Sequence, residues 1–158
     1  MVVSNNQNSY ALERAKTSNI PTYIITSKDK DEIDMELENA LSNYNVDLIV
    51  LAGYLKLIGN RLINKYTIIN THPSLLPKFG GKGMYGMNVH KAVVEAKEDF
   101  SGPTVHFVNN NYDEGNIISQ TKVKLSSTET AESLAKKVQE VEKIQLINVL
   151  KKFIDKKN

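Results

Sequence analysis

The sequence predicts an α/β fold in which strands and helices alternate along its 158 residues. The first sign is the continuous apolar run over residues 48–52, which is typical of a parallel strand covered on both faces. The second is the spacing of Ile33, Leu37 and Leu41, which places three apolar side chains on one side of a helix. Short β-branched runs separated by turn residues complete the pattern.

In the first half of the chain, each predicted strand is followed by a helix. A Ser side chain can accept a hydrogen bond from the first turn of a helix, so Ser27 is the predicted cap of the second helix. Pro73 and Pro77 prevent regular structure from continuing beyond the fourth strand. The predicted strands are residues 2–4, 23–26, 48–52 and 67–69, and the predicted helices are residues 9–17, 27–42 and 59–66.

The second half is predicted to contain a hairpin between two helices. Residues 104–108 and 117–125 are predicted to form antiparallel strands joined by a polar turn that is rich in Asn and Gly. The helices are predicted over residues 87–96 and 128–154. The long final helix should bury the stripe formed by Leu134, Val138, Val141 and Ile144.

Composition limits the classes of protein that fit. With 41% hydrophobic residues, 158 residues can supply the core of about one domain. The absence of cysteine excludes disulfides, zinc-thiolate sites and a Cys nucleophile. A net charge of +2 gives no case for nucleic acid, and no apolar run is long enough to span a membrane. Without a recognisable signal peptide, the predicted location is cytoplasmic.

Asn70 and His72 are the main candidates for chemistry, because they lie where an apolar strand breaks into a loop. Residues two apart on a strand point to the same side. An Asn amide can donate to a developing oxyanion, and a His can act as a general acid or as a second, charged donor. Alternatively, Asn70 ends the strand through a side-chain turn and His72 is an ordinary polar residue.

The sequence around this pair, NTHPSLLPKFGGKGMYGMNVHKAV, resembles the phosphoribosylglycinamide formyltransferase family. Further matching blocks occur in order along the chain: VSN, LERA, DLIVLAGYLKLI, GPTVHFV, YDEGNIISQ and residues 138–142. The resemblance implies a single formyltransferase domain over residues 1–158. It also implies a Rossmann-like fold, with a mostly parallel sheet and helices on both faces.

The resemblance implies transfer of a formyl group from 10-formyltetrahydrofolate to the amine of glycinamide ribonucleotide, in purine biosynthesis. The implied catalytic residues are Asn70, His72 and Asp113. In this interpretation Asp113 lies beside His72 and keeps the imidazole protonated near neutral pH. From the residues alone, Asp113 in YDEG is equally a turn residue.

The family also implies residues that bind the two substrates. Leu57 could equally belong to the core, Glu142 could pair with a neighbour on an exposed helix face, and Lys30 could be an ordinary exposed lysine. The implied folate-binding residues are Lys30, Leu55, Lys56, Leu57, Ile58, Asn70, Asn109, Tyr112 and Asp113, and the implied nucleotide-binding residues are Gln139 and Glu142.

A metal site is not expected. His72, His90 and His106 are too far apart in the sequence to form a chelating motif. His106 alternates with Val105 and Phe107, so it should point to the more polar face of its strand, either as a packed structural residue, which is favoured, or as a residue that supports the site.

Against the family pattern, the N-terminal strand, phosphate loop and first helix are expected to be missing here, which should weaken nucleotide binding more than folate binding. A second hypothesis is therefore a silent remnant that retains only folate binding. Three related kinds of enzyme also share N-x-H and stay open as hypotheses: methionyl-tRNA formyltransferase, sugar N-formyltransferases and formyltetrahydrofolate hydrolase. The sequence leaves the oligomeric state open, and a homodimer is compatible with it.

Overall fold

The computed structural model describes residues 1–155, apart from the side chain of Lys30, and divides the chain into two compact units. The first unit comprises Met1–Asp47 and Ile58–Tyr66. The second comprises Leu48–Leu57 and the chain from Thr67 onward. The predicted alternation of strands and helices is confirmed along the chain from Val2 to Glu95, after which four strands precede the final helix.

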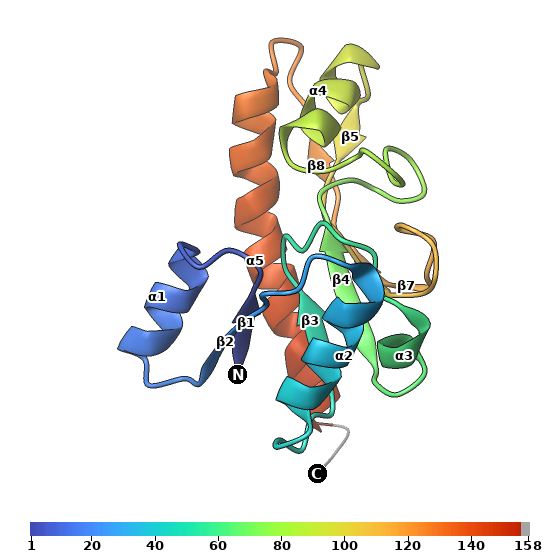
Figure 1. Cartoon of the computed structure of the whole chain (residues 1–158). Coiled ribbons are helices and arrows are strands. Elements are labelled where there is room, and N and C mark those ends of the chain that lie inside the picture. The colour runs from blue at the N-terminus through green and yellow to red at the C-terminus, as the bar shows by residue number, and fades with distance from the viewer. Residues whose placement is uncertain (156–158) are drawn as a thin grey trace. The chain divides into compact units, whose positions relative to one another are not determined.

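The first unit is built on a pair of parallel strands, with helix α1 beside them (Figure 1). Leu12 and Ala15 form the buried side of α1, as their spacing predicts. Helices α2 and α3 pack against each other. The elements of this unit are β1 (Val2–Ser4), α1 (Tyr10–Thr17), β2 (Thr22–Ile24), α2 (Lys30–Leu41) and α3 (Asn60–Ile63).

The cap of α2 differs from the predicted one. Asp29, not Ser27, precedes the helix, and its Oδ1 accepts from the backbone N–H of Asp31 at 2.9 Å. The backbone N–H of Ser27 instead donates to Glu36 Oε2 at 2.9 Å. Both residue types can cap a helix, but here the carboxylate also places a negative charge at the positive end of the helix dipole.

The second unit contains a four-stranded sheet in the order β3-β4-β6-β7 and a separate pair β5-β8. Strands β3 and β4 are parallel, whereas β6 and β7 form the predicted antiparallel hairpin. The predicted strand over residues 117–125 is divided into β7 and β8. The strands are β3 (Ile49–Leu51), β4 (Ile68–His72), β5 (Phe100–Ser101), β6 (Thr104–Phe107), β7 (Ile117–Gln120) and β8 (Val123–Lys124).

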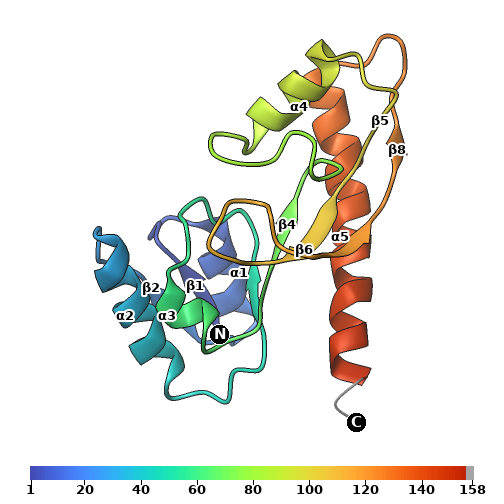
Figure 2. The ribbon, with the colours of Figure 1, turned by 90° about the vertical axis from the view of Figure 1, so that its right-hand side faces the viewer.

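Helix α5 (Ala131–Asp155) lies along one face of this sheet (Figure 2). Ile69 of β4, Val105 of β6 and Val149 of α5 form the core between them. Helix α4 (Met87–Glu95) packs against the first half of α5 through a second apolar cluster. Within residues 1–155, no helix combines the length and apolar content needed to cross a bilayer.

The predicted core stripe of α5 is wrong at Ile144, whose residue surface is 64% exposed. An α-helix turns by 100° per residue, so the steps of three that lead to Ile144 drift away from the buried line. That line runs through Leu134, Val138 and Val149, and it places polar Gln145 rather than Ile144 inside.

The strand that carries Asn70 and His72 should depend on its buried neighbour. Ile69 is fully buried, so Ile69→Ala should lower the free energy of unfolding by about 2 to 5 kcal/mol through lost burial and a cavity. Urea denaturation measures this change. Ile144→Ala is the matched control on the exposed side of α5, where we expect less than about 0.5 kcal/mol. Equal losses in the two variants would contradict this description of the core.

Candidate functional site

The site is assembled by the antiparallel pairing of β4 with β6. In this register Asn70 lies opposite His106, and His72 lies opposite Thr104. Side chains alternate along each strand, and directly opposed residues share a face of the sheet. Ile69 and Val105 face α5, so Asn70, His72 and His106 belong to the other face.

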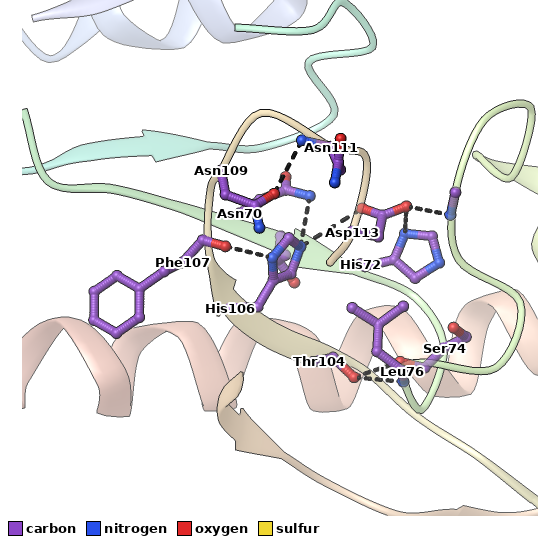
Figure 3. Close-up of polar contacts among 12 residues, drawn as sticks. Asn70, His72, Ser74, Leu76, Thr104, His106, Phe107, Asn109, Asn111 and Asp113 are labelled. Carbon is purple, nitrogen blue, oxygen red and sulfur yellow. Dashed lines mark hydrogen bonds and ion pairs between the residues drawn. The ribbon is translucent and has the colours of Figure 1, made fainter. Parts of the chain in front are cut away.

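Four polar side chains form a continuous row of contacts on this face (Figure 3). Asn70 Nδ2 lies 3.2 Å from His106 Nε2, which in turn lies 3.6 Å from Asp113 Oδ1. The other carboxylate oxygen, Asp113 Oδ2, lies 3.3 Å from His72 Nδ1. Both imidazoles are almost completely buried. The structure therefore brings together the three predicted catalytic residues and adds a fourth, His106.

His106 fixes the orientation of the Asn70 amide. Its Nδ1 lies 2.8 Å from the carbonyl oxygen of Phe107, which can only accept, so Nδ1 carries the proton. In the tautomer that carries its proton on Nδ1 alone, Nε2 accepts from the amide nitrogen of Asn70. An amide nitrogen has two N–H groups. One is used by His106, and the other remains to donate to a ligand.

His72 has a hydrogen-bond acceptor at each ring nitrogen. Nε2 lies 2.8 Å from the Phe79 carbonyl oxygen, and Nδ1 faces Asp113. A neutral imidazole has one N–H and satisfies only one of these acceptors, whereas the imidazolium satisfies both. The arrangement of acceptors therefore favours the charged ring.

Burial has the opposite and larger effect, because it lowers the pKa of His72 below its ordinary value. Asp113 and the Phe79 carbonyl raise the pKa, but not enough to reverse the net direction. The prediction that Asp113 keeps His72 protonated near neutral pH is thus wrong in its net result. Its premise, that the carboxylate favours imidazolium, holds.

Asp113 is held as a carboxylate. Burial raises its pKa, but the contact with His106, the charge of His72 and the backbone N–H of Gly81 together lower it. That N–H donates to Oδ2 at 2.9 Å. Asp113 has a φ of 59°, in the left-handed region that Asp tolerates better than most residues. Asp113 therefore lies in a turn and also lies beside His72, so the two interpretations of this residue do not exclude each other.

Sequence reasoning gave His106 a place in the site only as the less favoured alternative. The prediction of a packed structural residue is right about its burial, since only 2% of the residue is exposed. What it lacked was the register of β4 with β6, which places His106 opposite Asn70. The only signal in the sequence was the polar His106 between the apolar residues Val105 and Phe107 of a predicted strand.

The two predicted nucleotide-binding residues lie on α5. Glu142 is half-buried and its Oε1 accepts from Thr71 Oγ1 at 2.7 Å, whereas Gln139 is exposed. Thr71 points away from Asn70 and His72, because it lies between them on the strand. Glu142 still raises the pKa of His72 through its charge.

The predicted folate-binding residues are divided between the units. Asn109, Tyr112, Leu55, Lys56 and Leu57 belong to the second unit, where Leu55 is 57% exposed and Leu57 is half-buried. Ile58 is buried in the first unit. Lys30 begins α2 in the first unit, but its side chain lies outside the described part of the structure.

Chemically, the row from Asn70 to His72 combines a fixed amide donor with an imidazole next to a carboxylate. Such groups stabilise negative charge that develops on an oxygen during acyl transfer. In the chain up to residue 155, no three His, Asp or Glu side chains are arranged to hold a metal ion.

Comparison with known sequences identifies the family. The sequence profile described as formyl transferase matches residues 1–150. The chain is 43% identical over 144 residues to the chloroplastic phosphoribosylglycinamide formyltransferase of Arabidopsis thaliana, covering 87% of this chain and 49% of that protein. It is 36% identical over 147 residues to the enzyme of Haemophilus influenzae, covering 89% and 66%. The chain thus spans about half the length of the plant relative.

Comparison with solved structures supports the same family. The crystal structure of phosphoribosylglycinamide formyltransferase from Bacillus halodurans superposes with a TM-score of 0.89 at 31% sequence identity. The match covers 99% of this chain and 80% of that one. The enzyme from Brucella melitensis matches with a TM-score of 0.86 at 33% identity, covering 96% and 78%. The predicted Rossmann-like formyltransferase fold is confirmed.

The coupling of Asp113 to His72 can be measured directly. Asp113→Asn removes a negative charge that raises the pKa of His72, so this pKa should fall further below its ordinary value. An NMR titration of the His72 ring in both proteins measures the change. Asp155→Asn, an exposed substitution near the end of α5, should leave the pKa unchanged. A higher pKa in Asp113→Asn would contradict the assigned contact.

Proposed function

The chain belongs to the formyl transferase family, and on this premise we propose that it transfers a formyl group from 10-formyltetrahydrofolate to the primary amine of glycinamide ribonucleotide, in purine biosynthesis. The observation that carries the proposal is the contact row of Asn70, His106, Asp113 and His72. Relatives named for this reaction, at 36% to 43% identity, support the choice of substrates.

The proposed reaction begins when the amine attacks the formyl carbon. A carbon–nitrogen bond forms, and an oxyanion develops on the formyl oxygen. The free N–H of Asn70 donates to this oxygen, and protonated His72 places a positive charge beside it. Groups of this kind contribute about 3 to 4 kcal/mol each to transition-state stabilisation in sites that exclude water.

Collapse of the intermediate breaks the bond between the formyl carbon and the folate nitrogen. The attacking amine must lose a proton, and the departing nitrogen must gain one. We propose that Asp113 positions a water molecule that carries this proton, while its charge favours the protonated form of His72. No metal and no covalent enzyme intermediate takes part in this sequence.

The substrate contacts follow from the family. We propose that residues 55–58 bind the folate ring system, with exposed Leu55 offering an apolar surface. Asn109 and partly exposed Tyr112 flank the ring on the loop that carries Asp113. Lys30 is proposed to meet the folate carboxylates. Gln139 and Glu142, one turn apart on α5, are proposed to bind the nucleotide.

We further propose that residues 1–158 act as a single formyltransferase domain, supported by one family profile over residues 1–150. We also propose a cytoplasmic location. The near balance of 20 basic and 18 acidic residues supports an enzyme without a nucleic-acid or membrane partner. Sedimentation of the purified chain separates a monomer from a homodimer.

The experiment is a formyl-transfer assay with the purified chain, 10-formyltetrahydrofolate and glycinamide ribonucleotide, with the formylated nucleotide detected by mass. Product formation is expected. Folate binding without turnover would instead identify the silent remnant. Formylation of methionyl-tRNA, without formylation of the nucleotide, would instead identify a methionyl-tRNA formyltransferase.

Two substitutions test the proposed donors. Asn70→Ala and His72→Ala should each lower the rate constant for formyl transfer by about 100-fold or more, because each removes one stabilising group from the transition state. Folate affinity should change much less than the rate, because most of the proposed folate contacts lie on other residues. Asn148→Ala, an exposed change on α5, is the control and should keep the full rate. An unchanged rate constant in either Asn70→Ala or His72→Ala would contradict the proposed mechanism.

A further inference from the structure

Ser74 closes the turn that follows β4. The residue is completely buried, and its Oγ donates to the carbonyl oxygen of Lys78 at 2.6 Å. The next carbonyl along the chain, that of Phe79, is the acceptor of His72 Nε2 and lies 3.5 Å from Ser74 Oγ. One buried hydroxyl therefore supports the short segment that faces the His72 ring.

The turn is also fixed to the sheet at its base (Figure 3). Thr104 Oγ1 donates to the Ser74 carbonyl oxygen at 2.6 Å and accepts from the backbone N–H of Leu76 at 3.1 Å. Gln120 Nε2 donates both to Thr104 Oγ1 and to the Leu76 carbonyl oxygen, each at 2.9 Å. Ser74 thus connects strands β6 and β7 to the carbonyl group that contacts His72.

The Phe79 carbonyl needs such support, because the local backbone does not favour its position. Phe79 has a φ of 56°, a left-handed conformation that is unfavourable for a bulky aromatic residue. Gly80 and Gly81 follow it, and glycine restricts the backbone least. Without the Ser74 hydroxyl, the segment should relax away from this strained arrangement.

We propose that Ser74 is a positioning residue for formyl transfer, which acts through the Phe79 carbonyl to hold the His72 ring in its place beside Asp113. The proposal rests on the proposed function for its catalytic consequence. The effect on the His72 ring can be measured without any substrate.

The charge of His72 makes this effect measurable. Charged or titratable groups face the ring from four elements: Asp113 from the loop before β7, His106 from β6, Glu142 from α5 and His90 from α4. Asp113, Glu142 and the Phe79 carbonyl raise the pKa of His72, whereas burial and His106 lower it. Loss of the carbonyl contact should therefore lower the pKa further.

The test is Ser74→Ala in the full chain, followed by NMR titration of the His72 ring. A single hydrogen bond to the charged ring corresponds to a decrease in pKa of roughly 1. At a pH above this pKa, kcat should fall by roughly 10-fold with the protonated fraction, while KM stays unchanged. Ser101→Ala is the control, because it removes an equally buried hydroxyl that has no hydrogen-bond partner in the described chain.

A second pair of variants covers the case in which Ser74→Ala does not fold. Thr104→Val removes the hydroxyl that holds the Ser74 carbonyl and should lower the pKa of His72 in the same direction. Thr104→Ser keeps that hydroxyl and should restore the pKa.

An unchanged His72 titration in folded Ser74→Ala, or in Thr104→Val, would overturn the proposal and leave Ser74 a purely structural residue. A faster reaction in Ser74→Ala would also overturn it, because the Phe79 carbonyl would then compete with the substrate. A lowered pKa in a chain without turnover would remove the proposed function and keep the contact between Ser74 and His72.

Discussion

The antiparallel register of β4 with β6 is the constraint on which the site depends. It places Asn70 opposite His106, and it places Ile69 and Val105 against α5. A slip of one residue would turn the polar side chains into the core and the apolar ones toward the ligand. Burial of Ile69 and Val105 therefore fixes the positions of the amide and the imidazoles. In this sense the hydrophobic core and the proposed chemistry are specified by the same hydrogen-bond ladder.

The charge of His72 results from a competition within this framework. Burial favours the neutral ring, while Asp113 and the Phe79 carbonyl favour the charged ring. A donor whose pKa lies below the ordinary value releases its proton more readily than free imidazole does. An oxyanion that forms nearby would favour the charged ring again. A buried histidine between two acceptors is thus well suited to respond to charge that appears only during the reaction.

The sequence predicted much of the local structure, because periodicity reports which side of an element is buried. It placed a strand before Asn70, which the structure extends to His72, and it placed the β6–β7 hairpin and the long final helix. It failed at Ile144, where the spacing of apolar residues departs from the true pitch of the helix. The positions of His106 and Ser74 depend on strand register and on a turn, so no pattern along the chain could predict their contacts. The net pKa of His72 depends on burial, which is a property of the folded protein only.

The central claim is that protonated His72, held by Asp113 and the Phe79 carbonyl, stabilises the oxyanion of formyl transfer. The most direct test compares two curves on one protein: the single-turnover rate of formyl transfer against pH, and the NMR titration of His72 in the folate complex. The account predicts that the rate declines with rising pH through the same pKa at which His72 loses its proton. A rate that stays constant across the His72 titration would contradict it.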